Sequence, residues 1–174
     1  VEFKDPGENA KIDKPWALTG HQFKRPHNVV NSLYLKPADL ERLVKERFER
    51  YETIKKTEQR AEEYLVDDAD IVVVAYGASS RVARSAVNAA RAEGIKAGLI
   101  RPITLWPFPT DALQRAAQHV KKFLAVEMSM GQMVDDVRLA IHDQKPVEFY
   151  GRTGGMIPTP AEVLGAIKKA GGVL

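Results

Sequence analysis

Residues 71–80 read Ile-Val-Val-Val-Ala-Tyr-Gly-Ala-Ser-Ser, an uninterrupted apolar run that ends in a small-residue turn. A run of this kind predicts a strand buried on both faces, which is typical of parallel sheets covered by helices. Small apolar residues then recur at helical spacing from Val82 to Ala90, and Gly94 ends that helix. The segment therefore predicts a strand, a turn and a helix in succession.

The same unit repeats towards the carboxyl end. The predicted strands are 69–76, 95–100, 123–126 and 147–150, and the predicted helices are 82–94, 110–120, 133–141 and 159–171. Thr110 is expected to cap the second helix, and Thr159 opens the last one with a capping box and Pro160 in its first turn. Alternation of this kind predicts an α/β fold in which a mostly parallel sheet lies between two helical layers.

The chain before this region divides into two parts. Residues 1–36 show no sustained period and carry several Pro and Gly residues, so we expect an extended arm. Residues 37–65 have a narrow apolar stripe among balanced charges, which predicts a long helix packed on one side; a coiled coil is the alternative. Residues 66–174 then form one compact domain.

Composition excludes several kinds of site. The 174 residues include no Cys, so the chain lacks a Cys nucleophile, a thiolate zinc site and the ligands of an iron–sulfur cluster. The net charge is +3 and charges of both signs interleave, so we expect no nucleic-acid partner. No apolar run is long enough for a membrane span, so we expect a cytoplasmic protein. The first residue is Val1, which suggests that upstream sequence is missing.

In a parallel sheet, ligands bind beyond the carboxyl ends of the strands, so the candidate ligand-binding loops are 77–81, 101–109, 127–132 and 151–159. The first of these leads into a helix N-terminus, where Ser79, Ser80 and Arg81 supply groups that suit an anion. The alternative is that one of the two serines caps an ordinary helix. The Gly spacing after Gly77 matches neither a dinucleotide fingerprint nor a P-loop.

Arg101 and Glu127 each follow an apolar strand, where we expect them to pair with each other as a structural ion pair or to contact a ligand. Met128, Met130 and Met133 form either an adaptable surface or part of the core. The four histidines lack metal-ligand spacing, and there is no nucleophile elbow. The residues alone describe a domain without a complete active site.

The order of segments resembles the C-terminal part of the α subunit of 2-oxoacid:ferredoxin oxidoreductases, and most closely the branched-chain (3-methyl-2-oxobutanoate) type. The resemblance rests on residues 71–77, 98–109, 126–132 and 151–160, and it extends back through residues 28–35 and the charged helix. It implies a transketolase C-terminal-like domain, a five-stranded α/β/α sandwich that follows a pyrimidine-binding domain of the same subunit.

The resemblance also implies cofactors and partners outside this chain. In such complexes thiamine diphosphate with Mg²⁺ lies between the α and β subunits, iron–sulfur clusters on other domains or subunits pass electrons to ferredoxin, and CoA takes the acyl group. A thiamine-binding β subunit, iron–sulfur and γ subunits, and ferredoxin are the implied partners. The expected role of this domain is assembly, with the loops that carry Gly77, Arg101, Glu127, Gly131 and Gln132 facing an interface or the CoA approach.

Two alternatives remain open. One is a separate anion- or nucleotide-binding module that uses residues 77–81. The other is a scaffold domain of a different thiamine enzyme, such as a transketolase or a dehydrogenase E1 β chain. Both are compatible with the predicted fold, because one sheet architecture serves many functions.

Overall fold

The computed structural model describes residue 7, residues 14–17, residue 20 and residues 22–172. Contacts divide the chain into two units, Val1–Lys45 and Glu46–Leu174. The described residues between 22 and 36 form neither helix nor strand, and helix α1 (Pro37–Thr57) begins in the first unit and ends in the second. Asp39 in its first turn and Lys55 and Lys56 in its last suit the helix dipole.

The second unit is built around a five-stranded sheet. Its strands are β1 (Ala61–Tyr64), β2 (Ile71–Val74), β3 (Ala97–Pro102), β4 (Lys122–Glu127) and β5 (Val147–Gly151). They lie in the order β1-β3-β2-β4-β5, and only β1 is antiparallel to its neighbour. The prediction of a mostly parallel sheet is confirmed.

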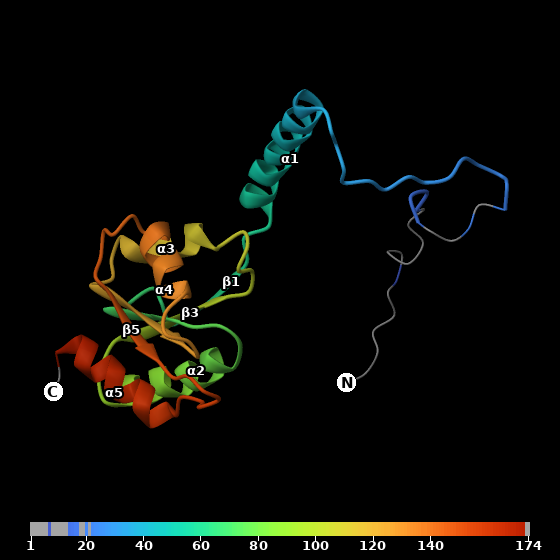
Figure 1. Ribbon diagram of the computed structural model, residues 1–174. Coiled ribbons are helices and arrows are strands. Elements are labelled where there is room, and N and C mark those ends of the chain that lie inside the picture. The colour runs from blue at the N-terminus through green and yellow to red at the C-terminus, as the bar shows by residue number, and fades with distance from the viewer. Residues whose placement is uncertain (1–6, 8–13, 18–19, 21, 173–174) are drawn as a thin grey trace. The chain divides into compact units, whose positions relative to one another are not determined.

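Four helices cover the two faces of the sheet: α2 (Gly77–Ala92), α3 (Thr110–Ala117), α4 (Met133–Ala140) and α5 (Pro160–Gly171). Figure 1 shows α2 and α5 on one face and α3 and α4 on the other. Successive residues of β2 point to opposite faces, so Val72 packs in the core under α3 and α4, and Val73 packs under α2 and α5. Because both faces are buried, the strand needs the continuous apolar run seen in its sequence. The three-layer α/β/α sandwich is therefore confirmed.

The predicted helix over residues 37–65 is too long. It ends at Thr57, and residues 61–64 form β1, which pairs with β3 in the register Ala61↔Pro102 to Tyr64↔Leu99. The apolar residues Ala61 and Leu65 happen to continue the helical spacing of the preceding stripe. The open edge of β3 offers backbone hydrogen bonds that a strand satisfies and a helix does not, and this long-range pairing overrides the local pattern.

The connection between β1 and β2 lies close against β3. A Cβ atom on Gly98 would lie 2.6 Å from the Leu65 carbonyl oxygen, so only glycine admits this approach. Arg91 of α2 donates to the same carbonyl at 2.8 Å and to the Ala97 carbonyl at 2.6 Å, and it pairs with Asp68 at 2.6 Å. One arginine thus joins α2, β3 and the β1–β2 connection.

The predicted helix ends are confirmed in part. Thr159 forms the capping box with Glu162, Pro160 occupies the first turn, and Gly172 ends α5 with a φ of +70°. Accepting hydrogen bonds from Thr159 lowers the pKa of Glu162 from its usual value. Thr110 does not cap α3, because the chain enters that helix one residue earlier and Pro109 occupies the cap position.

Candidate functional site

The carboxyl ends of β2 and β4 enclose a small cavity. It has a volume of about 190 Å³, and we call it the β2–β4 cavity. Its lining residues are Tyr76, Gly77, Ala78, Ser79, Glu127, Met128, Ser129 and Gln132. The predicted residues Gly77, Ser79, Glu127 and Gln132 therefore do come together, because their two strands are direct neighbours in the sheet.

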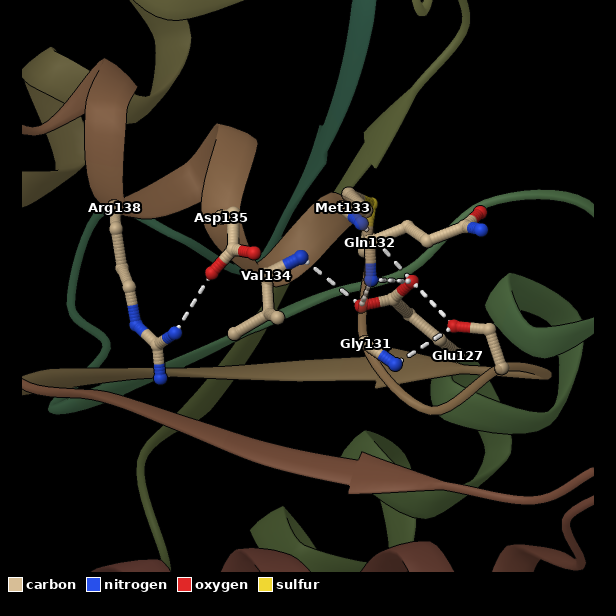
Figure 2. A network of polar contacts seen from close by, with 8 residues as sticks. Glu127, Gly131, Gln132, Met133, Val134, Asp135 and Arg138 are labelled. Atoms are coloured by element: carbon tan, nitrogen blue, oxygen red, sulfur yellow. Dashed lines mark hydrogen bonds and ion pairs between the residues drawn. The ribbon is translucent and has the colours of Figure 1, made fainter.

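Glu127 is the buried charge of this cavity, with only 2% of its surface exposed. Figure 2 shows its carboxylate directed at the first turn of α4, where it accepts hydrogen bonds from the backbone N–H groups of Met133 (3.0 Å) and Val134 (2.9 Å). It also accepts from the Gln132 N–H at 3.1 Å and from the Ser129 hydroxyl at 3.0 Å. A carboxylate at this place satisfies the donors that every helix N-terminus leaves unpaired, and it suits the helix dipole.

Gly131 completes the loop that places Glu127 against α4. Its N–H donates to the Ser129 hydroxyl at 3.0 Å, and its φ of +110° is a conformation that favours glycine. The carboxylate, the hydroxyl and the glycine N–H thus form one connected network (Figure 2). The loop over residues 128–132 is consequently held in one shape from within.

The predicted ion pair between Arg101 and Glu127 is wrong. β2 lies between β3, which carries Arg101, and β4, which carries Glu127. The Arg101 Nε donates to Glu62 of β1 at 2.9 Å instead. The partner of Arg101 is therefore on a strand, β1, whose residues were predicted to be helical.

A second depression lies where β1, β3 and α2 meet. It has a volume of about 350 Å³ and is lined by Glu62, Ser80, Arg81, Arg84 and Arg101; we call it the arginine groove. The predicted residues Ser80, Arg81 and Arg101 lie here, apart from Ser79 and Glu127. Glu62 was missed because residues 61–64 read as helix, and the signal that locates it is the pairing of β1 with β3. Arg84 was also missed, although it lies one helical turn after Ser80 and Arg81 on α2.

Glu62 pairs with both Arg84 and Arg101, one carboxylate oxygen for each. Partial burial alone would raise the pKa of Glu62, but the hydrogen bonds and charges of Arg84 and Arg101 outweigh it and lower the pKa below its usual value. The Arg84 guanidinium also lies 4.3 Å from the centre of the Tyr64 ring, which favours a cation–π contact.

The serines do not cap α2 as the alternative prediction held. The cap position is Tyr76, no side chain accepts from the first turn, and the Ser80 hydroxyl donates to the Gly77 carbonyl at 2.8 Å. The three methionines fall into both predicted classes. Met133 is in the core, whereas Met130 is 84% exposed and Met128, which lines the β2–β4 cavity, is 44% exposed.

Asp136 lies near Glu127 on the first turns of α4. Desolvation, followed by the negative charges of Glu127 and Asp135, raises the pKa of the Asp136 carboxyl above its usual value. In the part of the chain that the structure describes, no group of three or more His, Asp or Glu side chains is placed to hold a metal ion. None of the helices described there has the length and apolar character that a bilayer crossing requires.

Comparison with known proteins gives consistent results. A family model described as pyruvate:ferredoxin oxidoreductase core domain II matches residues 69–163. The ketoisovalerate oxidoreductase subunit VorB of Methanothermobacter thermautotrophicus is 45% identical over 99% of this chain and 48% of its own length. The 2-oxoglutarate synthase subunit KorA of Methanothermobacter marburgensis is 45% identical over 58% of this chain and 27% of its own. The chain spans about half the length of the VorB relative.

Two solved structures share the fold. A 2-oxoglutarate:ferredoxin oxidoreductase from Magnetococcus marinus, with 2-oxoglutarate, coenzyme A and succinyl-CoA bound, superposes with a TM-score of 0.64 at 23% identity. The match covers 78% of this chain and 24% of that one. A split-gene transketolase, an inactive β4 tetramer, gives a TM-score of 0.55 at 22% identity over 64% of this chain and 41% of its own.

Proposed function

Because the chain belongs to the family of the pyruvate:ferredoxin oxidoreductase core domain II, and with it to the 2-oxoacid:ferredoxin oxidoreductases, we propose that it is part of a branched-chain 2-oxoacid oxidoreductase. The proposed reaction of the complete enzyme is oxidative decarboxylation of a branched 2-oxoacid. CoA takes the acyl group, CO₂ leaves, and ferredoxin receives the electrons. The chain is proposed to act there as the C-terminal assembly domain of the α subunit.

One observation carries the branched-chain proposal. The match to the subunit named for ketoisovalerate runs over 99% of this chain, whereas the match to the subunit named for 2-oxoglutarate covers 58% at the same 45% identity. The first match therefore includes the arm and α1 as well as the α/β domain. Similarity that extends through irregular chain favours a shared place in a similar complex, because such segments vary more freely than a core does.

The residues of this chain do not fit the cofactors that the family implies. Without Cys the chain offers no thiolate to an iron–sulfur cluster, and the described residues place no acidic or His cluster around a possible Mg²⁺. We therefore assign thiamine diphosphate, its Mg²⁺ and the clusters to the upstream pyrimidine-binding domain, the β subunit and the iron–sulfur and γ subunits.

The proposed role in assembly uses the loop that Glu127 holds. Hydrogen bonds from four donors to the Glu127 carboxylate fix the loop after β4, while Met128 and Met130 stay exposed. A rigid loop that presents methionine loses little conformational entropy on binding, and methionine adapts its shape to an apolar partner. We assign this surface to contact with another domain or subunit, beside the approach of CoA.

The experiment is to purify the tagged protein from its native host, identify the copurifying chains by mass, and assay CoA-dependent viologen reduction with 2-oxoacids. The expected result is a complex with iron–sulfur subunits that reduces viologen fastest with 2-oxoisovalerate. Faster reduction with 2-oxoglutarate or pyruvate would contradict the branched-chain assignment. Copurification with transketolase or E1 subunits, without viologen reduction, would support the scaffold of a different thiamine enzyme.

A further inference from the structure

We infer that the arginine groove is a binding site for a phosphate group. The groove gathers Arg81 and Arg84 from α2 and Arg101 from β3, and its only acidic lining residue is Glu62. This inference does not rest on the proposed function, because it is drawn from the charges and contacts of this chain alone.

The charge of the groove favours a dianion. Three guanidinium groups face one carboxylate, so two positive charges stay uncompensated within the lining. Within the described part of the chain, Arg81 forms no ion pair. The first turn of α2 holds no acidic residue, so the positive end of the helix dipole adds to the field instead of being offset.

The arrangement of the guanidinium donors favours phosphate, which has several oxygen acceptors, over an anion of a single atom. Glu62 takes the Arg101 Nε and one terminal nitrogen of Arg84, so both terminal nitrogens of Arg101 and the rest of the Arg84 fork keep donors for a ligand. Glu62 and the Tyr64 ring hold the two forks in place before any ligand binds. Preorganised guanidinium forks are the groups that bind phosphate oxygens in pairs.

The size and lining of the groove limit what else it holds. Its volume of about 350 Å³ is at the lower end of small-molecule sites, and every lining side chain is polar or charged. None of these lining side chains is an aromatic or aliphatic group that could cover a base or an acyl chain. The groove therefore recognises the phosphate group itself, either free or as the charged end of a nucleotide.

Calorimetric titration of the full chain with inorganic phosphate at low ionic strength tests the site. We expect saturable binding that weakens at least about tenfold in Arg81→Gln and in Arg101→Gln, since each replacement removes charge-assisted hydrogen bonds. The matched control is Arg115→Gln, an exposed arginine of α3 that pairs with Glu63 outside the groove; its affinity should stay within about twofold of the original.

Titration with adenosine 3′,5′-bisphosphate distinguishes the two sources of phosphate. Affinity equal to that of inorganic phosphate assigns the groove to free phosphate, and tighter binding that Arg81→Gln abolishes assigns it to a nucleotide. Absence of saturable binding up to about 10 mM phosphate would overturn the inference. Equal affinity of Arg81→Gln and the original chain would overturn it as well. We expect that variant to fold, because the Arg81 side chain is exposed and forms no ion pair with the residues that the structure describes.

Discussion

The charges of Glu127 and Arg101, each at the end of a strand, are compensated by contacts with neighbouring elements. Glu127 turns back onto the helix that follows its own strand, and Arg101 pairs across to Glu62 on the adjacent edge strand. Burying a charge is costly unless hydrogen bonds compensate it, so each side chain takes the nearest set of partners. The sequence identifies the two positions as unusual, but strand order selects their partners.

Replacing Glu127 by Ala is expected to destabilise the protein by about 3 kcal/mol, because the first N–H groups of α4 lose their acceptor inside the core. The measurement is urea unfolding followed by circular dichroism. Glu58→Gln, which removes an exposed carboxylate paired with Arg60, serves as the control and should change stability by less than about 0.5 kcal/mol. An equal effect of both variants would refute the capping role of Glu127.

Gly151 is expected to tolerate no side chain. A Cβ atom there would meet the Ser129 carbonyl oxygen and the Phe149 ring, so Gly151→Ala should destabilise by about 2 kcal/mol as the loop after β4 shifts. Gly165→Ala is the matched control, since its Cβ would meet nothing within 4 Å on α5. That control should stabilise the protein by up to about 1 kcal/mol, because alanine favours a helix over glycine. Both changes are read from unfolding curves; a stabilised Gly151→Ala variant would refute the close approach.

Asp136→Asn is expected to stabilise the protein at neutral pH and to have little effect at pH 3. The pKa of Asp136 is raised in the folded state, so the folded protein holds this proton more readily than the unfolded chain does. The stability that follows from this preference is lost as the pH rises through the raised pKa, and Asn avoids the loss. Unfolding free energies of both proteins between pH 3 and 7 measure it, with Asp67→Asn as an exposed control. If the stability gained by Asp136→Asn decreased towards neutral pH, the raised pKa of Asp136 would be contradicted.

The edge strand β1 is not recognisable in the sequence, because the apolar residues at 61 and 65 fit the helical periodicity of α1. Residues 37–57 form a helix, but Ala61 and Leu65 lie seven and eleven residues after Ile54 and so still fit the helical spacing of the stripe. The strand forms because residues 99–102 of β3 offer an edge with backbone groups free to pair. Just beyond it, the Arg60 carbonyl accepts hydrogen bonds from the backbone N–H groups of Ile103 and Thr104. Local propensity is a weak determinant when a long-range ladder is available.

This assignment predicts how the domain responds to truncation. A chain of residues 58–174 should unfold cooperatively, whereas one of residues 66–174 lacks β1 and should be far less stable and prone to self-association through the bare edge of β3. Thermal unfolding and size-exclusion chromatography compare the two. Equal stability would show that β1 is dispensable and that the domain begins at residue 66.

Across the whole α/β domain, the parallel strands bring together loops that are far apart in the sequence. Tyr76, Met128, Met130, Met156 and Ile157 follow β2, β4 and β5, and all of them are exposed. An exposed apolar set at one edge of a sheet is typical of a contact surface. The proposed place of this chain within a larger enzyme depends on this edge.

Met130→Glu is expected to reduce the amount of copurifying subunits at least about tenfold while leaving the unfolding curve of the chain unchanged, since a charge at a desolvated contact weakens binding. Quantitative mass spectrometry of the purified complex measures the loss. Leu139→Glu is the control, because Leu139 is also highly exposed but lies on α4 away from the strand-end loops. Unchanged recovery of partners with Met130→Glu would remove this loop from the interface.

The layered α/β class can be predicted from the sequence, because apolar runs of strand length alternate with helical periodicity, and both signals are local. The sequence also predicts the capping box of α5 and the strand-end loops, which depend on neighbouring residues. The family followed from four short runs around those same loops.

The order of the strands becomes known only from the folded sheet, and that order separates the predicted residues into the β2–β4 cavity and the arginine groove. The tertiary structure also created β1, joined Glu62 to two arginines and turned Glu127 onto α4. These features depend on backbone and charge partners that are distant in sequence or set by the path of a loop. The local sequence pattern does not predict these partners, because they come together only when the sheet has formed.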